Sequence, residues 1–204
     1  MCIRDRLFTQ AIRFKDDHGN DFPDWEEKHI GELFSERSEK GYPELELLSV
    51  SIKNGVHRQS DGNKRDTSNS DKSNYKRVMV GDIAYNSMRM WQGASAVSQL
   101  EGLVSPAYTI LKSSNGTHPR FYGYLFKMTE MIQMFQRYSQ GLTSDTWNLK
   151  YPAISRIRAI CPTEEEQTKI ADFLSAIDRK IESVATQITE TQTFKRGLLQ
   201  QMFV

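Results

Sequence analysis

The segment that most constrains this chain is residues 162–204, because its apolar side chains repeat with the spacing of a two-stranded coiled coil. Successive positions are separated by four, three, four, three and four residues, at Ile170, Leu174, Ile177, Ile181, Val184 and Ile188. Thr191 and Lys195 then fall on this seam, which resumes at Leu198 and Met202. The pattern predicts a long helix with one continuous apolar stripe.

The start of this helix is marked in the sequence as well. Thr163 follows Pro162, and Glu166 stands three residues further on, which is the spacing of a capping box. A helix of about forty residues would be about 60 Å long at 1.5 Å per residue, longer than a small domain is wide. Much of it should therefore project from the rest of the chain.

An apolar stripe often packs against the helix's own domain, and that alternative is open here. Length and period favour a partner helix, because a short globular contact needs only two or three turns at a spacing of 3.6. The segment carries five positive and seven negative side chains, so it is a poor surface for DNA. We interpret it as a scaffold for dimerisation through the eight seam residues.

Composition sets the broad class. With 204 residues, 38% apolar and 26% charged, the chain can build one ordinary domain and a helical arm. The sequence has no long apolar run and no secretion signal at its start, which predicts a cytoplasmic protein without membrane contact. Cys2 and Cys161 lack companion ligand spacings, so neither a disulfide framework nor a metal site is expected.

The middle of the chain mixes strand and helix patterns. Strands are predicted over residues 45–56, 78–85, 103–111 and 154–160, and a helix rich in Met and aromatic residues over 121–138 should lie in the core. Residues 1–20 form a poorly ordered lead-in. We therefore predict an α+β fold, in which a mixed α/β globular domain over residues 21–161 precedes a long coiled-coil helix over residues 162–204.

The most basic stretch is residues 51–77, with seven positive side chains against three negative ones. It is filled with Ser, Asn and Gly, and it is either a solvated loop or a segment laid against DNA phosphates. The candidate phosphate contacts are Lys53, Arg58, Lys64, Arg65, Lys72, Lys76 and Arg77.

Two further clusters combine aromatic with polar side chains near predicted strand ends. Arginine suits the edge of guanine, and Asn or Gln suits adenine, although the same residues also occupy many idle surfaces. The candidates for base reading are Arg89, Trp91, Gln92, Ser144, Trp147 and Asn148.

No catalytic residue is predicted. The sequence lacks the Gly-x-x-x-x-Gly-Lys-Ser/Thr loop, the Gly-rich dinucleotide fingerprint and the Asn/Asp-Pro-Pro-aromatic quartet of amino-methyltransferases. Asp24 and Glu26-Glu27-Lys28 suggest pieces of a metal-dependent nuclease, but such carboxylates usually come from separate strands. A nuclease with a dimerising arm is kept as the alternative, and a purely structural coiled-coil adaptor as a third class.

Several short motifs, taken in order, are specific in combination. They are Arg13-Phe14 ahead of Phe22-Pro23-Asp24-Trp25; Gly81-Asp82-Ile83-Ala84-Tyr85-Asn86; Gly102-Leu103-Val104-Ser105-Pro106-Ala107-Tyr108; Cys161-Pro162 before Glu166-Gln167-Thr168-Lys169-Ile170-Ala171; and Lys195-Arg196-Gly197-Leu198-Leu199-Gln200-Gln201-Met202-Phe203. From about residue 11 onward the chain resembles a target-recognition domain and attached helix from the specificity subunit of a type I restriction–modification system. Met1 to Arg6 does not resemble the start of that family.

The resemblance implies a non-catalytic, sequence-specific double-stranded DNA-binding module. A full subunit of that family carries two recognition domains, each reading half of a split site, and two antiparallel helices that hold them apart. Its partners are a methyltransferase subunit and a restriction and motor subunit, to which S-adenosylmethionine, ATP and magnesium belong. With one domain and one helix, this chain resembles a half-subunit, expected to form a homodimer or to pair with another specificity chain.

Overall fold

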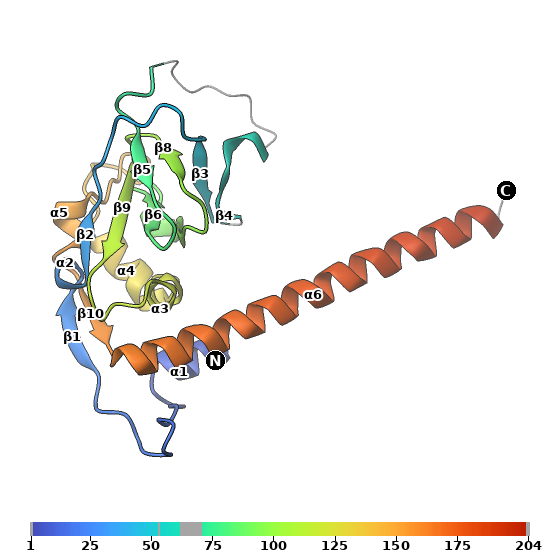
Figure 1. The fold of residues 1–204 in the computed structure, drawn as a ribbon, viewed down its shortest axis with the longest axis horizontal. Coiled ribbons are helices and arrows are strands. Elements are labelled where there is room, and N and C mark those ends of the chain that lie inside the picture. Colours follow the sequence, from blue (N-terminus) through green and yellow to red (C-terminus); the bar gives the residue numbers. More distant parts are fainter. Residues whose placement is uncertain (1, 53, 62–70, 203–204) are drawn as a thin grey trace.

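The computed structural model describes residues 2–52, 54–61 and 71–202, which form a globular domain and one helix that projects from it (Figure 1). This helix, α6 (Glu164–Met202), has 39 residues and is therefore about 58 Å long at 1.5 Å per residue. The mixture of helices and sheets followed by the long helix confirms the predicted α+β class.

The centre of the domain is a four-stranded antiparallel sheet. Its strand order is β2-β9-β6-β7, formed by β2 (Phe34–Glu36), β9 (Tyr108–Ser113), β6 (Ile83–Asn86) and β7 (Ser95–Val97). In its two central strands Ile83 lies opposite Leu111, and Ala84 lies opposite Ile110. Because successive side chains point to opposite faces of a strand, this register gives the sheet two apolar faces.

Each face of the sheet packs against a different layer. Ile83, Tyr85 and Leu111 belong to the larger core cluster, which the helices and β10 complete. Ala84 and Ile110 belong to a smaller cluster with side chains of β3, β5 and β8. These strands form short antiparallel pairs, β3 (Leu48–Ser51) with β4 (Gly55–Arg58) and β5 (Lys76–Val78) with β8 (Gly102–Val104).

The helices on the larger cluster explain the Met-rich and aromatic segment. They are α1 (Ile3–Phe8), α2 (Ile30–Leu33), α3 (Pro119–Leu125), α4 (Thr129–Tyr138) and α5 (Tyr151–Ile154). The predicted helix over residues 121–138 is two helices, because the backbone is extended at Met128, the residue before α4. Its assignment to the core is confirmed, since Met131 and Phe135 are buried.

All four strand predictions need correction. Residues 45–56 contain β3 and the start of β4, two strands of a hairpin, in place of one strand. Residues 78–85 and 103–111 each divide between two sheets, with turns at Gly81-Asp82 and at residues 105–107. The first turn is held by the buried Asp82 carboxylate, which accepts from Arg37 Nε at 2.7 Å and from the Met79 amide at 2.8 Å. Residues 154–160 contain the end of α5 and the start of β10 (Arg158–Cys161), which pairs with β1 (Glu26–His29).

The predicted loose lead-in is also different in the structure. Its first part is α1, whose Leu7 and Phe8 are buried in the larger cluster, and the Phe8 ring lies 5.3 Å from that of Phe121. Further along, residues 16–20 form a turn in which the Asp16 carboxylate accepts backbone hydrogen bonds from His18 and Asn20. Burial of these two bulky apolar side chains can order a helix of six residues. The sequence did not predict this helix because most residues around Leu7 and Phe8 are polar.

The junction with α6 is polar and buried. Thr163 Oγ1 accepts from the Glu166 amide at 3.3 Å, so the predicted cap is present, but the return contact of a capping box is replaced. The Glu166 carboxylate is completely buried and accepts from Arg13 Nε at 3.1 Å, Arg13 Nη2 at 2.9 Å and Trp25 Nε1 at 2.8 Å. The buried Gln167 joins the Pro162 carbonyl and residues 116–118.

The first turns of α6 belong to the domain, which corrects part of the predicted dimer seam. Ile170 is 1% exposed and Leu174 is 4% exposed, both within the larger core cluster. Further along, Tyr124 of α3 donates its hydroxyl to Asp178 Oδ2 at 2.7 Å and lies 3.2 Å from Ser175 Oγ. We call residues 164–178 the anchored segment and residues 179–202 the arm.

Candidate nucleic-acid interface

Two loops predicted separately from the sequence meet in the structure. We call residues 86–93 and 140–150 the reading loops. The Leu149 amide donates to the Ser87 carbonyl at 2.8 Å, and the rings of Trp91 and Trp147 pack edge to face with centroids 5.3 Å apart. The buried Tyr85 donates its hydroxyl to the Leu149 carbonyl at 3.0 Å, so a strand of the central sheet supports both loops.

The first reading loop is shaped by local hydrogen bonds at the end of β6. Asn86 Oδ1 accepts from the Met88 amide at 3.0 Å, which turns the chain into the short 3₁₀ helix η2 (Met90–Gln92). Gly93 ends it with φ of 79°, a left-handed conformation that favours glycine. Because Met90 is buried beneath, the side chains of Arg89 and Gln92 are exposed.

The second reading loop is closed at its base by a pair of backbone hydrogen bonds between Gln140 and Asn148, at 3.0 and 2.8 Å. Thr143 and Thr146 hold its tip through hydrogen bonds of their own. Ser144 is exposed at this tip, whereas Trp147 and Asn148 are half-buried beside the first loop. Of the six predicted base-reading residues, Trp91 and Trp147 are in contact. The other four lie in the same two loops, at Arg89, Gln92, Ser144 and Asn148.

Lys127 fastens the first reading loop from below. Its ammonium donates to the carbonyls of Gly93 and Ser95, and burial lowers the pKa of Lys127 to about 8. Loss of hydration around the ammonium lowers the pKa by more than the two carbonyl hydrogen bonds raise it, and the positive charge of nearby Arg4 lowers it further. The sequence analysis missed this residue, although a lone lysine inside the predicted Met-rich and aromatic helix over residues 121–138 was a usable signal.

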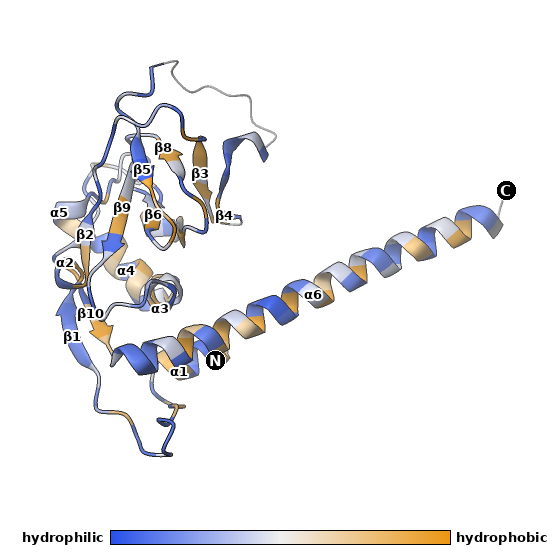
Figure 2. Ribbon diagram, viewed as in Figure 1, coloured by the Kyte–Doolittle hydropathy of each residue, from blue (hydrophilic) through white to orange (hydrophobic). Residues whose placement is uncertain are grey.

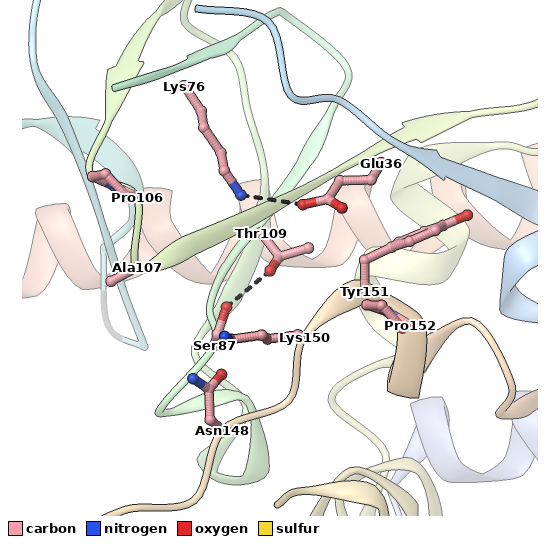
Figure 3. Close-up of a pocket in the computed structure, with 10 residues that line it drawn as sticks. All are labelled: Glu36, Lys76, Ser87, Pro106, Ala107, Thr109, Asn148, Lys150, Tyr151 and Pro152. Atoms are coloured by element: carbon pink, nitrogen blue, oxygen red, sulfur yellow. Dashed lines mark hydrogen bonds and ion pairs between the residues drawn. The ribbon is translucent and has the colours of Figure 1, made fainter. Parts of the chain in front are cut away.

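A cavity of about 460 Å³ opens beside the reading loops (Figure 3). Lys76 reaches into it and is held by Glu36 Oε1 at 3.1 Å and the Tyr108 carbonyl at 3.0 Å. Ser87 and Thr109 share a hydrogen bond at 2.8 Å on another wall. Asn148 also lines the cavity, and its buried Oδ1 has no partner within the described residues. The cavity therefore offers both donors and acceptors.

The basic segment is not a loop throughout, because it contains β4, the 3₁₀ helix η1 (Gln59–Asp61) and the start of β5, and its contacts with DNA stay a prediction. Arg58 pairs with Glu46 at 2.7 Å, Lys76 pairs with Glu36, and Arg77 Nη2 lies 2.5 Å from Glu101 Oε1 and Nη1 lies 3.4 Å from Glu39 Oε2. Part of their charge is therefore neutralised within the chain. Lys72 is half-exposed. Lys53, Lys64 and Arg65 lie outside the described residues.

The arm carries the remaining predicted seam. Hydrophobic residues recur along it between hydrophilic ones (Figure 2), and Ile181, Val184 and Ile188 are 61%, 41% and 52% exposed. Leu198 is exposed as well, and the side chain of Met202 lies outside the described part, whereas the predicted seam residue Ile177 belongs to the anchored segment and is half-buried near its end. The arm thus presents an apolar stripe that its own domain does not cover.

The near-adjacent acidic residues do not assemble a metal site. Lys28 pairs with Glu26 at 3.3 Å, and Asp24 lies 3.9 Å from Arg13. Among the described residues, no three or more His, Cys, Asp or Glu side chains are grouped so that they could hold a metal ion. No helix in the same part of the chain is both long and apolar enough to cross a membrane.

Comparisons with known proteins agree on one class. A family described as type I restriction modification DNA specificity domain matches residues 23–192. The specificity subunit of the type I restriction enzyme HindI from Haemophilus influenzae is 23% identical over 192 residues, which cover 89% of this chain and 41% of that protein.

Solved structures share the fold at low sequence identity. The HsdS subunit from Thermoanaerobacter tengcongensis matches with a TM-score of 0.50 and 13% identity, over 84% of this chain and 42% of that one. The type I restriction–modification S subunit from M. genitalium matches with a TM-score of 0.54 and 16% identity, over 86% and 44%. The chain therefore spans less than half the length of these relatives.

The chain combines a mixed α/β domain with a projecting helix. The chain belongs to the type I restriction modification DNA specificity domain family, whose model covers most of its length. None of these findings favours the nuclease alternative.

Proposed function

We propose that this chain is a non-catalytic DNA-recognition half-subunit of a type I restriction–modification system. It acts in the cytoplasm and directs a methyltransferase subunit and a restriction and motor subunit to a bipartite DNA site. S-adenosylmethionine, ATP and magnesium are used by those partners and not by this chain. Membership of the specificity-domain family supports the proposal.

The observation that carries DNA reading is the meeting of the two reading loops. Arg89 and Gln92 are exposed beside the Trp91–Trp147 pair, so bidentate hydrogen-bonding groups stand next to flat aromatic surfaces. Such side chains can contact base edges, and the sheet beneath would hold them in fixed positions. Asn148 and Lys76 add an amide and a cation at the neighbouring cavity.

Phosphate contacts supply the rest of the affinity in this proposal. The phosphate backbone of the DNA is attracted by Lys72, Lys53, Lys64 and Arg65. Three other cations form ion pairs with carboxylates of the domain, namely Arg58, Lys76 and Arg77. A contact made by a paired cation would weaken the pair, so it would add less affinity than a contact from a free one.

Two copies associate through their arms. Burying an aliphatic side chain contributes about 1.5–3 kcal/mol, and the arm exposes Ile181, Val184 and Ile188 on one side, with Leu198 further along. Antiparallel pairing would place the two domains at opposite ends, related by a two-fold axis. Identical domains in that arrangement would read inverted half-sites separated by an unread spacer.

The test is to express the chain with a methyltransferase subunit of its system and to sequence the modified bases. The expected result is a palindromic, bipartite motif. A methylated site without two-fold symmetry would overturn the homodimer in favour of pairing with another specificity chain. Unchanged methylation when the chain is omitted would overturn its role in recognition.

A further inference from the structure

The junction between domain and helix contains more polar contacts than attachment alone requires. Apolar packing of Ile170 and Leu174 holds the start of α6 against the domain and restricts its tilt, but the hydrophobic driving force itself is non-directional. Hydrogen bonds weaken steeply with distance and angle, so they restrict direction. The anchored segment has hydrogen bonds of this kind near both of its ends.

The first set of contacts lies at the start of α6, and we call it the proximal fastener. Its centre is the completely buried Glu166 carboxylate, which accepts three hydrogen bonds from Arg13 and Trp25. Replacing a buried ion pair by well-packed apolar residues is often neutral or stabilising, so such a pair is weak evidence for stability alone. What the Glu166 cluster adds beyond stability is a fixed direction, because its hydrogen bonds require a particular orientation of α6 relative to the domain.

The second set, the distal fastener, is the Tyr124 hydroxyl with Asp178 and Ser175. Burial and the hydrogen bond to Asp178 hold the pKa of Tyr124 above its ordinary value, so the phenol stays protonated as a donor. Glu166 and Asp178 are twelve residues apart, which corresponds to about 18 Å along the helix. Two separated points define the direction of an axis.

A small tilt at the junction has a large effect at the end of the arm. The arm of 24 residues is about 36 Å long, so a tilt of about 5° displaces its end by about 3 Å. One base-pair step of DNA is about 3.4 Å long. The direction of α6 must therefore be held to a few degrees if a dimer is to select one spacer length.

We propose that the two fasteners set the direction of the arm and thereby select the length of the DNA spacer, with Tyr124, Trp25 and Glu166 as positioning residues. This rests on the proposed dimeric DNA-reading function, but the direction of the arm can be measured without DNA. The conservative variants Tyr124→Phe and Trp25→Phe remove one hydrogen-bond donor each and keep the aromatic ring. Tyr138→Phe, on the exposed side of α4, is the matched control.

The first measurement is the distance between spin labels at Arg137→Cys in the domain and Lys195→Cys in the arm, with Cys2→Ser and Cys161→Ala as background. Labelled chains are diluted with unlabelled ones so that only distances within one chain contribute. Tyr124→Phe and Trp25→Phe should broaden the distance distribution, and their combination should broaden it further. Tyr138→Phe should leave it unchanged.

The second measurement is binding to split DNA sites whose spacers differ by one base pair. The unaltered chain should prefer one spacer, and Tyr124→Phe should reduce this preference by roughly tenfold, the factor that corresponds to one hydrogen bond to a charged group. An unchanged spacer preference in the combined variant would overturn the inference, whether or not the distance distribution broadens. If the unaltered chain binds no split site at all, the proposed function fails, and the label distances still decide whether the fasteners direct the arm.

Discussion

The anchored segment and the arm are parts of one continuous helix with the same apolar spacing, yet they meet different surroundings. Ile170 and Leu174 are buried in the domain's own core, whereas Ile181 and Ile188 are exposed. A heptad repeat shows that one side of a helix will be covered, but it does not say by what. Here the domain covers the first turns, and the remaining turns are available to a second chain.

The boundary between the anchored segment and the arm also separates two proposed functions, DNA reading and association. The domain with the anchored segment carries the reading loops and the core that supports them, while the arm carries the exposed apolar stripe. Changes in the first region should therefore alter folding or DNA choice, and changes in the second should alter association.

The largest effect on stability is expected in the anchored segment. Leu174→Ala removes a buried side chain from the larger core cluster and should lower the free energy of unfolding by about 2–5 kcal/mol. Denaturant unfolding followed by tryptophan fluorescence would measure it. Ile188→Ala, the matched control in the arm, should leave the unfolding of the domain unchanged, and equal losses from both variants would contradict the division.

The largest effect on association is expected in the arm. Replacing Ile181, Val184 and Ile188 with Asp places three charges on the proposed contact, which should abolish self-association while the domain stays folded. Light scattering at tens of micromolar would measure the mass, and circular dichroism would check the fold. The homodimer is wrong if the unaltered chain is already a monomer under these conditions.

Arg89→Ala tests whether DNA choice depends on the domain and not on the arm. Loss of a bidentate contact to a base should cost about 1–3 kcal/mol at one base pair and relax the choice there. The motif obtained by sequencing methylated DNA would show the change at one position in each half-site. Arg120→Ala removes an exposed arginine from α3 and should leave the motif unaltered; the same change in both variants would refute the assignment.

The pH dependence of stability should reveal Lys127 as a buried support. Because folding lowers the pKa of Lys127 from 10.5 to about 8, the unfolded chain binds more protons between these values. The contribution of Lys127 to stability should therefore rise as pH increases from about 8 towards 10, and it should be constant below that window. Lys127→Met removes the titrating group, so the difference in unfolding free energy between pH 8 and pH 10 should shrink.

The smallest effect concerns the salt dependence of DNA binding. Replacing Lys64 and Arg65 with Ala should reduce the slope of log K against log salt by roughly two units and weaken all DNA alike. Arg179→Ala with Lys180→Ala removes the same charge from the arm and should leave the slope unchanged. An unaltered slope in the first variant would show that these two residues do not contact phosphates.

The sequence by itself was enough to predict the long helix, its cap at Thr163 and the α+β class, because these depend on local spacing and periodicity. It also indicated that polar and aromatic side chains gather in both reading loops, and their role in reading bases stays a prediction. Residues 78–85 and residues 103–111 were each predicted as one strand, although each range contributes to two sheets. A short apolar run does not show where the chain passes from one sheet to another.

Contacts between distant residues were decided only by the tertiary structure. The pairing of Trp91 with Trp147, the burial of Ile170 and Leu174, and the use of Glu166 by Arg13 and Trp25 each join segments separated by dozens of residues. The physical reason is that a side chain's local pattern fixes which face it occupies, whereas the fold of the whole chain determines what that face meets. For this protein, that difference separates the part of α6 that belongs to the domain from the part that is left for a partner.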